Sequence, residues 1–408
     1  MLFKEIPQGL KPYFKPYKKL FNKADYKHFQ TLVTGLIVND NKTLQEINDS
    51  LSDKNQSSLN RFVNSDWNRD AVNNVRLQQA KQKLLRDEKG TLIIDDTLLH
   101  KTGKKMEKAN YHRSGVTKKL EWGHCMVNSV LASNTSTPLY PITEDIYVRK
   151  EDCDDIPFRT KRNIALSQVG YACVHSILFD TVIVDAGFQD SNLYNEIMSL
   201  GLDVLMGIRV STKISINRKK RVSIGTYLGT LTDDDFKAVI HNDKAYFIHT
   251  KEVSVRQVGK VMLVISYKQG DEENIKIYMS SLFEKTKEEL AGILIKRWDV
   301  ECWHRDAKQY LGLESYQLRK YRGVRNVVTA VLVAYTLLVL SQKRGILARM
   351  NSFFGRGLET IGELCRFMQQ AALKGWRYMR CLFKKPEEFR NFLNKQILVK
   401  NAKVCACN

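Results

Sequence analysis

Short apolar runs are the most regular feature of residues 89–210. Two of them, Thr91–Ile94 and Thr181–Val184, have the length and composition of buried strands. Around them lie three further strand-like segments and one helical pattern: Gly123–Ala132, Pro138–Tyr147 and Asp203–Arg209, and the helix Arg159–His175. Because strands alternate with helical segments, these residues are predicted to form an α/β domain with a mixed sheet and flanking helices.

Residues 211–283 alternate β-branched and polar side chains densely, which is typical of strands joined by turns. The runs are Lys213–Ile216, Arg221–Tyr227, Ala245–Thr250, Val261–Tyr267 and Asn274–Met279. We therefore expect a β-rich insertion in the α/β domain. One hairpin tip within it carries four consecutive cations, which suit contacts to phosphate and a solvated turn about equally: Arg218, Lys219, Lys220 and Arg221.

The first 88 residues have a helical pattern. Thr43 and Glu46 form a capping-box pattern at the start of Leu44–Leu51, and Ser57 can cap a second helix, Ser58–Val63. Two short helices around a tight turn suit a helix-turn-helix that binds DNA, and they suit an ordinary helical bundle equally well.

Residues 284–342 return to a helical pattern that includes the apolar run Val327–Leu340. This run is shorter than the roughly 18 residues of a membrane span, so we expect a buried helix and no membrane insertion. Residues 343–408 are predicted to form a basic helical region. Its aromatic residues lie among cations in a mixture that suits a DNA backbone or a packed surface helix: Trp376, Tyr378 and Phe383, with Arg377, Arg380, Lys384 and Lys385.

The net charge of the chain is more unusual than its composition. The 408 residues are 43% hydrophobic, which is ordinary, but carry a net charge of +21. Such an excess points to a polyanionic partner, with nucleic acid ahead of an anionic membrane, because no long amphipathic basic helix stands apart from the core. The eight cysteines form no CxxC pair, which favours a reducing, cytosolic setting. No GxxxxGK[ST] loop indicates a nucleotide cofactor.

Carboxylates follow the two buried strands directly. Asp95 and Asp96 come after the first strand, and Asp185 follows the second. The carboxyl ends of strands in an α/β sheet are where ligands collect, and a buried carboxylate without a partner is costly unless a cation joins it. Several carboxylate oxygens together suit Mg²⁺ or Mn²⁺, and two such ions suit phosphoryl transfer. Each aspartate alone could also be a turn residue or a helix cap.

A third acid lies on the helix after the insertion. Arg297, Glu301, His304 and Lys308 are spaced by four, three and four residues, so they share one helix face. This arrangement allows Glu301 to bind a metal while the cations contact phosphates. A solvated helix with an Arg297–Glu301 ion pair is the alternative.

With these residues in place, the chain resembles the DDE transposases of bacterial and archaeal insertion sequences, in the branch with a β-rich insertion before the last acid. The similarity is carried by five segments: Ser58–Phe62, Ser65–Trp67, Ile94–Thr97, Val184–Gly187 and Arg297–Leu313. Within the last, Arg297, Glu301 and Lys308 match the family's Tyr-x2-Arg-x3-Glu-x6-Lys signature, with Leu294 at the tyrosine position.

The resemblance implies a ribonuclease-H-like core in which Asp96, Asp185 and Glu301 hold two divalent cations, with Asp95 as the alternative first acid. It implies hydrolysis at the ends of a mobile element, followed by attack of the freed 3′-hydroxyl on target DNA. A dimer is expected in the DNA complex, in a cytoplasmic, nucleoid-associated setting. Some relatives stack a flipped base on an aromatic residue of the insertion. The candidates are Tyr227, Phe236, Tyr246 and Phe247.

DNA contacts are expected from Arg297, His304 and Lys308, from Lys104 and Lys105 in the lysine-rich stretch after the first strand, and from the Arg218–Arg221 tip. Two other functions fit the same residues. One is a metal-dependent nuclease that cuts without joining, and the other is a non-catalytic DNA-binding protein derived from a transposase.

Overall fold

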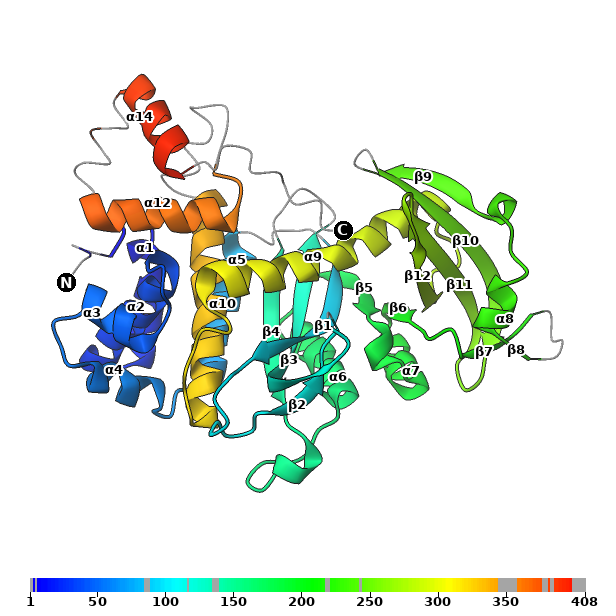
Figure 1. Cartoon of the computed structure of the whole chain (residues 1–408), viewed down its shortest axis with the longest axis horizontal. Helices are drawn as coiled ribbons and strands as arrows, with labels where there is room; N and C mark the ends of the chain where they lie inside the picture. Colours follow the sequence, from blue (N-terminus) through cyan, green and yellow to red (C-terminus); the bar gives the residue numbers. More distant parts are fainter. Residues whose placement is uncertain are drawn as a thin grey trace.

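The computed structural model describes residue 3 and residues 6–83, 89–115, 117–133, 139–216, 221–241, 244–343, 358–375, 381 and 385–397. Three regions lie side by side in Figure 1: N-terminal helices, a central sheet, and a β-rich region. A long helix, α9 (Lys287–Leu311), runs across all three. At 1.5 Å per residue this helix is about 37 Å long, so a single element contacts each region.

Five strands form the central sheet in the order β4-β3-β1-β5-β6. Their bounds are Gly90–His100 for β1, Leu120–Ser133 for β3, Tyr140–Tyr147 for β4, Phe179–Val184 for β5 and Asp203–Gly207 for β6. The first three strands along the chain pair antiparallel, and β5 and β6 run parallel to β1. This mixed sheet confirms the predicted α/β class and the ribonuclease-H-like core.

Helices cover both faces of this sheet (Figure 1). Leu92 and Ile94 of β1 face the core shared with α6 (Lys161–Val174) and α7 (Ser191–Ser199). Ile93 faces the opposite core, which includes α9 and α10 (Tyr321–Lys343). The alternation follows from the two-residue period of a strand. A short strand, β2 (Asn110–Arg113), pairs antiparallel with β3. The short helices η2 (Lys150–Asp152) and η3 (Ala186–Phe188) lie in connections between the longer elements.

The β-rich insertion continues the central sheet. Its elements are β7 (Lys213–Ser215), β8 (Val222–Ser223), α8 (Ile224–Leu228), η4 (Asp233–Asp235), β9 (Lys237–His241), β10 (Lys244–Val255), β11 (Gly259–Lys268) and β12 (Asp271–Ser280). The last strand pairs antiparallel with β6, through Tyr278 opposite Gly207 and Ser280 opposite Leu205. One hydrogen-bonded sheet therefore runs through both regions. The strand expected over Arg221–Tyr227 is wrong in its second half, because Ser223 caps α8 by accepting from the Thr226 amide.

The N-terminal region is helical, as predicted, with α1 (Lys11–Phe14), η1 (Lys15–Leu20), α2 (Lys23–Val38), α3 (Leu44–Leu51), α4 (Gln56–Val63) and α5 (Arg69–Lys83). Thr43 caps α3 as expected. Asn55, and not Ser57, caps α4, because its side chain accepts from the Ser57 amide. The described C-terminal elements are α12 (Ile361–Lys374), α14 (Pro386–Phe392) and η5 (Leu393–Ile397).

The helix α10 is long and apolar enough to cross a membrane, but 94% of its most apolar window is buried inside the fold. It packs on α5, α2, α9, α12 and β4. The apolar run is therefore a core helix, as the sequence predicted.

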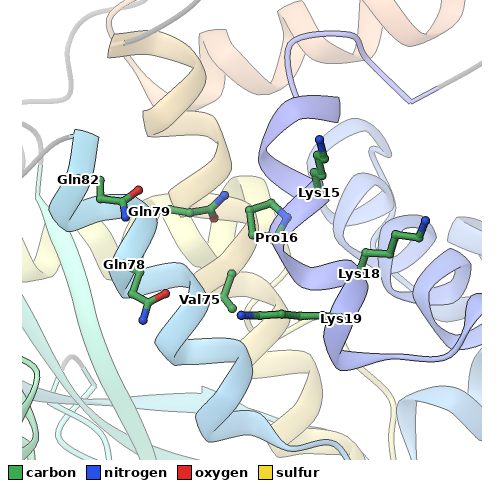
Figure 2. A pocket seen from close by; sticks show the side chains of 8 residues that line it. All are labelled: Lys15, Pro16, Lys18, Lys19, Val75, Gln78, Gln79 and Gln82. Atoms are coloured by element: carbon green, nitrogen blue, oxygen red, sulfur yellow. The ribbon is translucent and has the colours of Figure 1, made fainter.

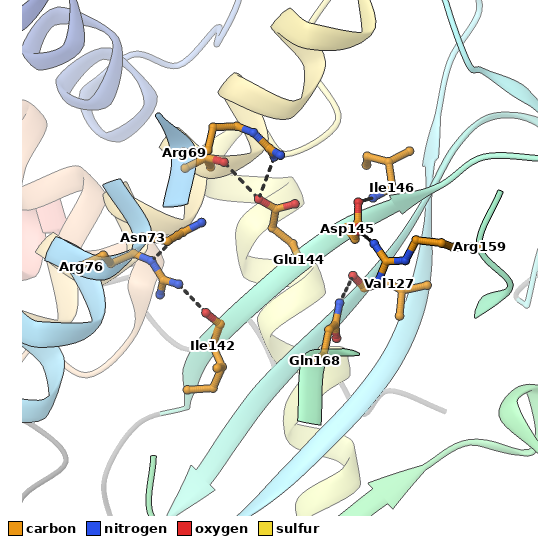
Figure 3. A network of polar contacts seen from close by, with 11 residues as sticks. Arg69, Asn73, Arg76, Val127, Ile142, Glu144, Asp145, Ile146, Arg159 and Gln168 are labelled. Atoms are coloured by element: carbon orange, nitrogen blue, oxygen red, sulfur yellow. Dashed lines mark hydrogen bonds and ion pairs between the residues drawn. The ribbon is translucent and has the colours of Figure 1, made fainter. Parts of the chain in front are cut away.

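A buried polar network joins α5 to β4 (Figure 3). The guanidinium of Arg76 is fully buried and donates to the carbonyls of Pro141 and Ile142, each at 2.5 Å. The β3–β4 register shifts at this point, so Ile142 has no paired residue on β3, while Pro141 lies opposite Val130. Beside it, Glu144 accepts from Thr329 of α10 at 3.0 Å and lies 3.9 Å from Arg69. These contacts fix the helical region on the sheet.

Candidate active site

Strand β1 continues through both candidate aspartates and ends at His100. The sequence predicted a strand that ends at Ile94, with both acids just after it. The longer strand forms because β3 pairs with β1 along its full length, from Gly90 opposite Ser133 to His100 opposite Gly123. Neighbouring residues of a strand point to opposite faces, so Asp95 and Asp96 are separated by the sheet.

Asp95 lies on the face that α9 covers. Burial raises the pKa of Asp95 to about 8, and the nearby charges of Asp185 and Asp96 add to the shift, while Arg297 acts against it. The Nη1 atom of Arg297 lies 3.9 Å from Oδ2 of Asp95. The side chain of Asp95 is only 15% exposed. A partly buried carboxylate beside a second carboxylate is an environment that a cation would stabilise.

Asp185 follows the last residue of β5 and precedes η3. Its side chain makes no capping hydrogen bond to η3, so its carboxylate is not used for local structure. The end of β6 lies close to the backbone that follows Asp185: a Cβ at Gly207 would be 2.5 Å from the Ala186 nitrogen. Glycine at this position lets the ends of β5 and β6 stay together and fixes the position of Asp185.

Glu301 enters from α9, whose register is fixed at both ends. Thr286 and Glu289 form a capping box at its start, and Gly312 ends it with a φ of +69°. The Nη2 atom of Arg297 donates to Oε1 of Glu301 at 2.7 Å. Arg297 therefore bridges Glu301 to Asp95, and Tyr278 of β12 hydrogen-bonds the same guanidinium.

Asp96 faces the opposite side of the sheet. Its carboxylate forms an ion pair with Lys161 at the start of α6 and accepts from the thiol of Cys125 at 3.2 Å. The structure thus brings Asp95, and not Asp96, next to Asp185 and Arg297. The sequence choice of Asp96 rested on the threonine that follows it, which carries no information about the face of the strand.

The other predicted residues of α9 also contact the sheet. His304 is buried, and its Nε2 atom donates to Oδ1 of Asn128 at 2.5 Å. Burial lowers the pKa of His304 to about 3, so this ring is neutral at pH 7 and holds α9 on β3. Lys308 is partly exposed and donates to the carbonyl of Leu98 at 2.7 Å. Leu98 lies on β1 after the two aspartates.

Lys104, Lys105 and Arg221 are exposed, as a phosphate contact requires. The remaining cations of the predicted hairpin tip, Arg218, Lys219 and Lys220, lie outside the described residues. So do the C-terminal aromatic residues and most of the cations among them: Trp376, Arg377, Tyr378, Arg380, Phe383 and Lys384. Lys385 is described and pairs with Glu388 at 2.8 Å.

Three of the four aromatic candidates of the insertion pack in one cluster. The Tyr227 hydroxyl and Nε2 of His249 are 2.9 Å apart, and Phe236 packs on His249 with ring centroids 5.7 Å apart. Phe247 stacks on Tyr267 at 5.1 Å. Tyr246 precedes Phe247 on β10, so its side chain points to the opposite face of the strand. The three clustered rings therefore pack against other side chains of the insertion.

A groove of about 740 Å³ lies between η1 and α5, far from the acids (Figure 2). Its lining contains three lysines and three glutamines and no carboxylate: Lys15, Lys18, Lys19, Gln78, Gln79 and Gln82, with Pro16 and Val75. Gln79 is committed to structure, because its amide donates to the Tyr13 carbonyl at 2.9 Å. This groove has no ligands for a metal and is not the site of the acids.

Among the described residues, no three His, Cys, Asp or Glu side chains are gathered closely enough to hold a metal ion together. Glu301 is held by Nη2 of Arg297, and Asp95 lies 3.9 Å from Nη1 of the same guanidinium. The donor set nevertheless fits a hard divalent cation. The candidate ligands are the carboxyl groups of Asp95, Asp185 and Glu301, so all the donor atoms are oxygens, the type that such a cation prefers.

Comparisons with known proteins show the family to which the chain belongs. The model of a family described as "DDE superfamily endonuclease" matches residues 16–223, which include Asp95, Asp96 and Asp185 and end before Glu301. Among solved structures, the chain is similar to the Drosophila P element transposase strand transfer complex, with 11% identity and a TM-score of 0.27. That match covers 54% of this chain and 55% of the other. No curated protein matches the chain.

Proposed function

Because the chain belongs to the DDE superfamily endonucleases, we propose that it is a transposase of the insertion-sequence type. It binds the ends of a mobile element, cleaves the DNA by metal-dependent hydrolysis, and joins the freed 3′-hydroxyl ends to target DNA. The observation that carries this proposal is the meeting of Asp95 and Asp185 under Arg297 and Glu301 of α9.

We assign Asp95, Asp185 and Glu301 as the catalytic acids, in place of the set that begins with Asp96. They would hold two divalent cations, Mg²⁺ or Mn²⁺, which supply a clamp on the attacking and leaving oxygens of a phosphodiester when bound. Support comes from the raised pKa of Asp95, which reflects burial next to the charge of Asp185. The acids carry the metal and the cations of α9 bind the substrate.

The chain's own residues have separate tasks. Arg297 provides a fixed positive charge between Asp95 and Glu301, and a scissile phosphate at this place would bind to the same guanidinium. Tyr278 and the α9 capping box hold Arg297 and Glu301 in register. Lys308 is positioned by the Leu98 carbonyl to bind the phosphates next to the cut.

Double-stranded DNA is the proposed partner, and the net charge of +21 supports it. The short helices α3 and α4 are joined by a turn, an arrangement that suits contact with DNA. Joining two element ends suits a dimer in the DNA complex. The protein acts in the cytoplasm, on DNA of the nucleoid, without a nucleotide cofactor.

A matched pair of substitutions tests the assignment. Asp95→Asn, Asp185→Asn and Glu301→Gln should each reduce metal-dependent DNA cleavage at least 100-fold, since each removes a ligand worth several kcal/mol in the transition state. Asp96→Asn changes the neighbouring residue in the same way but affects the contacts with Lys161 and Cys125 on the opposite face of the sheet, so cleavage should fall less than about ten-fold.

Cleavage is measured on duplexes that carry the DNA flanking the reading frame, and binding is measured in parallel to exclude misfolded variants. Full activity of Asp95→Asn would remove this residue from the site. The same assay with a second duplex added as target separates transposition from a nuclease function. Cleavage without a joined product would favour a nuclease of the same fold.

A further inference from the structure

Exposed aromatic side chains lie on the hairpin of β2 and β3, at the outer end of the central sheet. Tyr111 is 46% exposed and Leu120 is 68% exposed. Trp122 pairs with Tyr111 across the hairpin, and the two ring centroids are 5.3 Å apart with the rings at 66° to each other. Trp122 is half-buried, so the ring that faces water is that of Tyr111. This ring is therefore available to a ligand.

A lysine completes this aromatic pair. The Nζ atom of Lys104 lies 4.7 Å from the centroid of each ring and donates to the Tyr111 hydroxyl at 3.0 Å. From residue 101 to residue 122 the sequence has seven Lys and Arg against two Glu. Four more cations of this stretch are exposed, and no carboxylate pairs with them in the part of the chain that the structure describes: Lys105, Arg113, Lys118 and Lys119. The charge of this surface matches a polyanion.

The loop that carries Lys104 is anchored on both sides. The Nε1 atom of Trp122 donates to the Gly103 carbonyl at 2.8 Å, which fixes the indole ring. Lys101 is buried and donates to the carbonyls of Glu314 and Tyr316. The carboxylate of Glu107 accepts from the backbone amide of Tyr321 at 2.9 Å. The rings are held in place before any ligand arrives, so binding costs little conformational entropy.

This surface lies on the same face of the sheet as Asp95. Asn128 is directly opposite Asp95 on β3, and Trp122 is six residues from Asn128 along that strand, so the two share a face. Six residues of strand correspond to about 20 Å. Lys308 contacts β1 between the two places, at Leu98. Lys308, which also pairs with Glu314 at 3.3 Å, therefore lies between the acids and the pair of Tyr111 and Trp122.

We propose that Tyr111, Trp122 and Lys104 bind an unpaired nucleotide of the DNA substrate, about 20 Å from the scissile phosphate. A base stacks on the Tyr111 ring with Trp122 at its edge, and the Lys104 ammonium binds the adjacent phosphate. An unpaired base is required because the bases of a duplex cover each other's π-faces. The inference rests on the proposed function, since it takes DNA at the acids as its reference point.

Binding of fluorescent DNA to the full-length protein tests this site, with metal chelated so that no cleavage occurs. Two probes are compared: a blunt duplex, and the same duplex with a short single-stranded tail. Tyr111→Ala should weaken binding of the tailed duplex about ten-fold, as expected for the loss of one base–aromatic stack, and leave the blunt duplex unchanged. Tyr111→Phe keeps the ring and should bind the tailed duplex as tightly as the wild type, within about two-fold.

Phe158→Ala is the matched control, because Phe158 is an aromatic residue of similar exposure, at 40%, outside the proposed site. It should bind both probes like the wild type. Equal binding of the tailed duplex by Tyr111→Ala and the wild type overturns the stacking site and leaves the proposed function intact. An equal loss for both probes also overturns it, because the contact is then to duplex. Failure of the wild type to bind either probe contradicts the proposed function itself.

Discussion

Glu144 is a buried carboxyl group between three elements, where α5, β4 and α10 meet (Figure 3). Burial raises the pKa of Glu144 to about 7, and the charge of Arg69 acts against the shift. The folded protein therefore holds this proton more tightly than the unfolded chain. The stability that results is complete below about pH 4.5 and is lost as the pH rises to about 7, on the order of 3 kcal/mol.

Glu144→Gln should remove this pH dependence, because an amide remains neutral and can still accept from Thr329. In urea unfolding at pH 5 and pH 8, the free energy of unfolding of the wild type should lose about 3 kcal/mol more than that of Glu144→Gln over this interval. Glu151→Gln, at an exposed carboxylate, should behave like the wild type. If Glu144→Gln kept the full pH dependence of the wild type, that dependence would come from other groups.

The choice between two adjacent aspartates shows what the sequence could not decide at the scale of single residues. The apolar run Thr91–Ile94 predicted a strand that delivers acids to one edge of the sheet, and the structure has that strand. The choice between Asp95 and Asp96 depends on which face α9 covers, and this is set by packing between segments about 200 residues apart. A two-residue period says only that the acids diverge.

At the scale of elements, Arg76 holds α5 to β4 by donating to the carbonyls of Pro141 and Ile142 at the β-bulge. Replacing it with methionine fills similar space but leaves two buried acceptors without donors. Arg76→Met should lower the free energy of unfolding by about 3 kcal/mol. Arg76→Lys keeps the charge but has no fork for two carbonyls, so its effect should be intermediate.

Chemical unfolding of the three proteins at pH 7 measures this ordering. A methionine variant as stable as the wild type would show that water or backbone movement satisfies the carbonyls. The matched substitution Arg162→Met, at an exposed ion pair with Asp190, should cost less than about 1 kcal/mol.

Elements with strong local signals were predicted closely. The helical pattern that starts at residue 284 became α9, and the alternating runs of the insertion became β10, β11 and β12. Elements decided by nearby side chains were less predictable: Asn55 takes the cap of α4 from Ser57, and Ser223 converts a β-branched run into α8. The pairing of β12 with β6 has no signature in either strand, since it follows from the path of the whole chain.

For the whole molecule, the distribution of charge predicts how DNA affinity responds to salt. With six to ten phosphates contacted, affinity should fall roughly 10³–10⁵-fold between 50 and 200 mM salt. The slope should be the same for wild type and Asp185→Asn, because the role proposed for this acid is to hold metal and not to contact the DNA backbone. Filter binding or fluorescence anisotropy over this salt range measures it, and a flat dependence would contradict the phosphate contacts.

The shared ladder of β6 and β12 has a consequence for the newly made protein. When β6 leaves the ribosome, its neighbour β12 lies about 70 residues further along the chain. At about 5–20 residues per second, the edge of β6 stays open for roughly 4–14 s. An apolar strand with free amides and carbonyls is a template for pairing with another chain. We therefore expect chains truncated after β6 to aggregate, and chaperone demand during synthesis to depend on how fast residues 208–280 are translated.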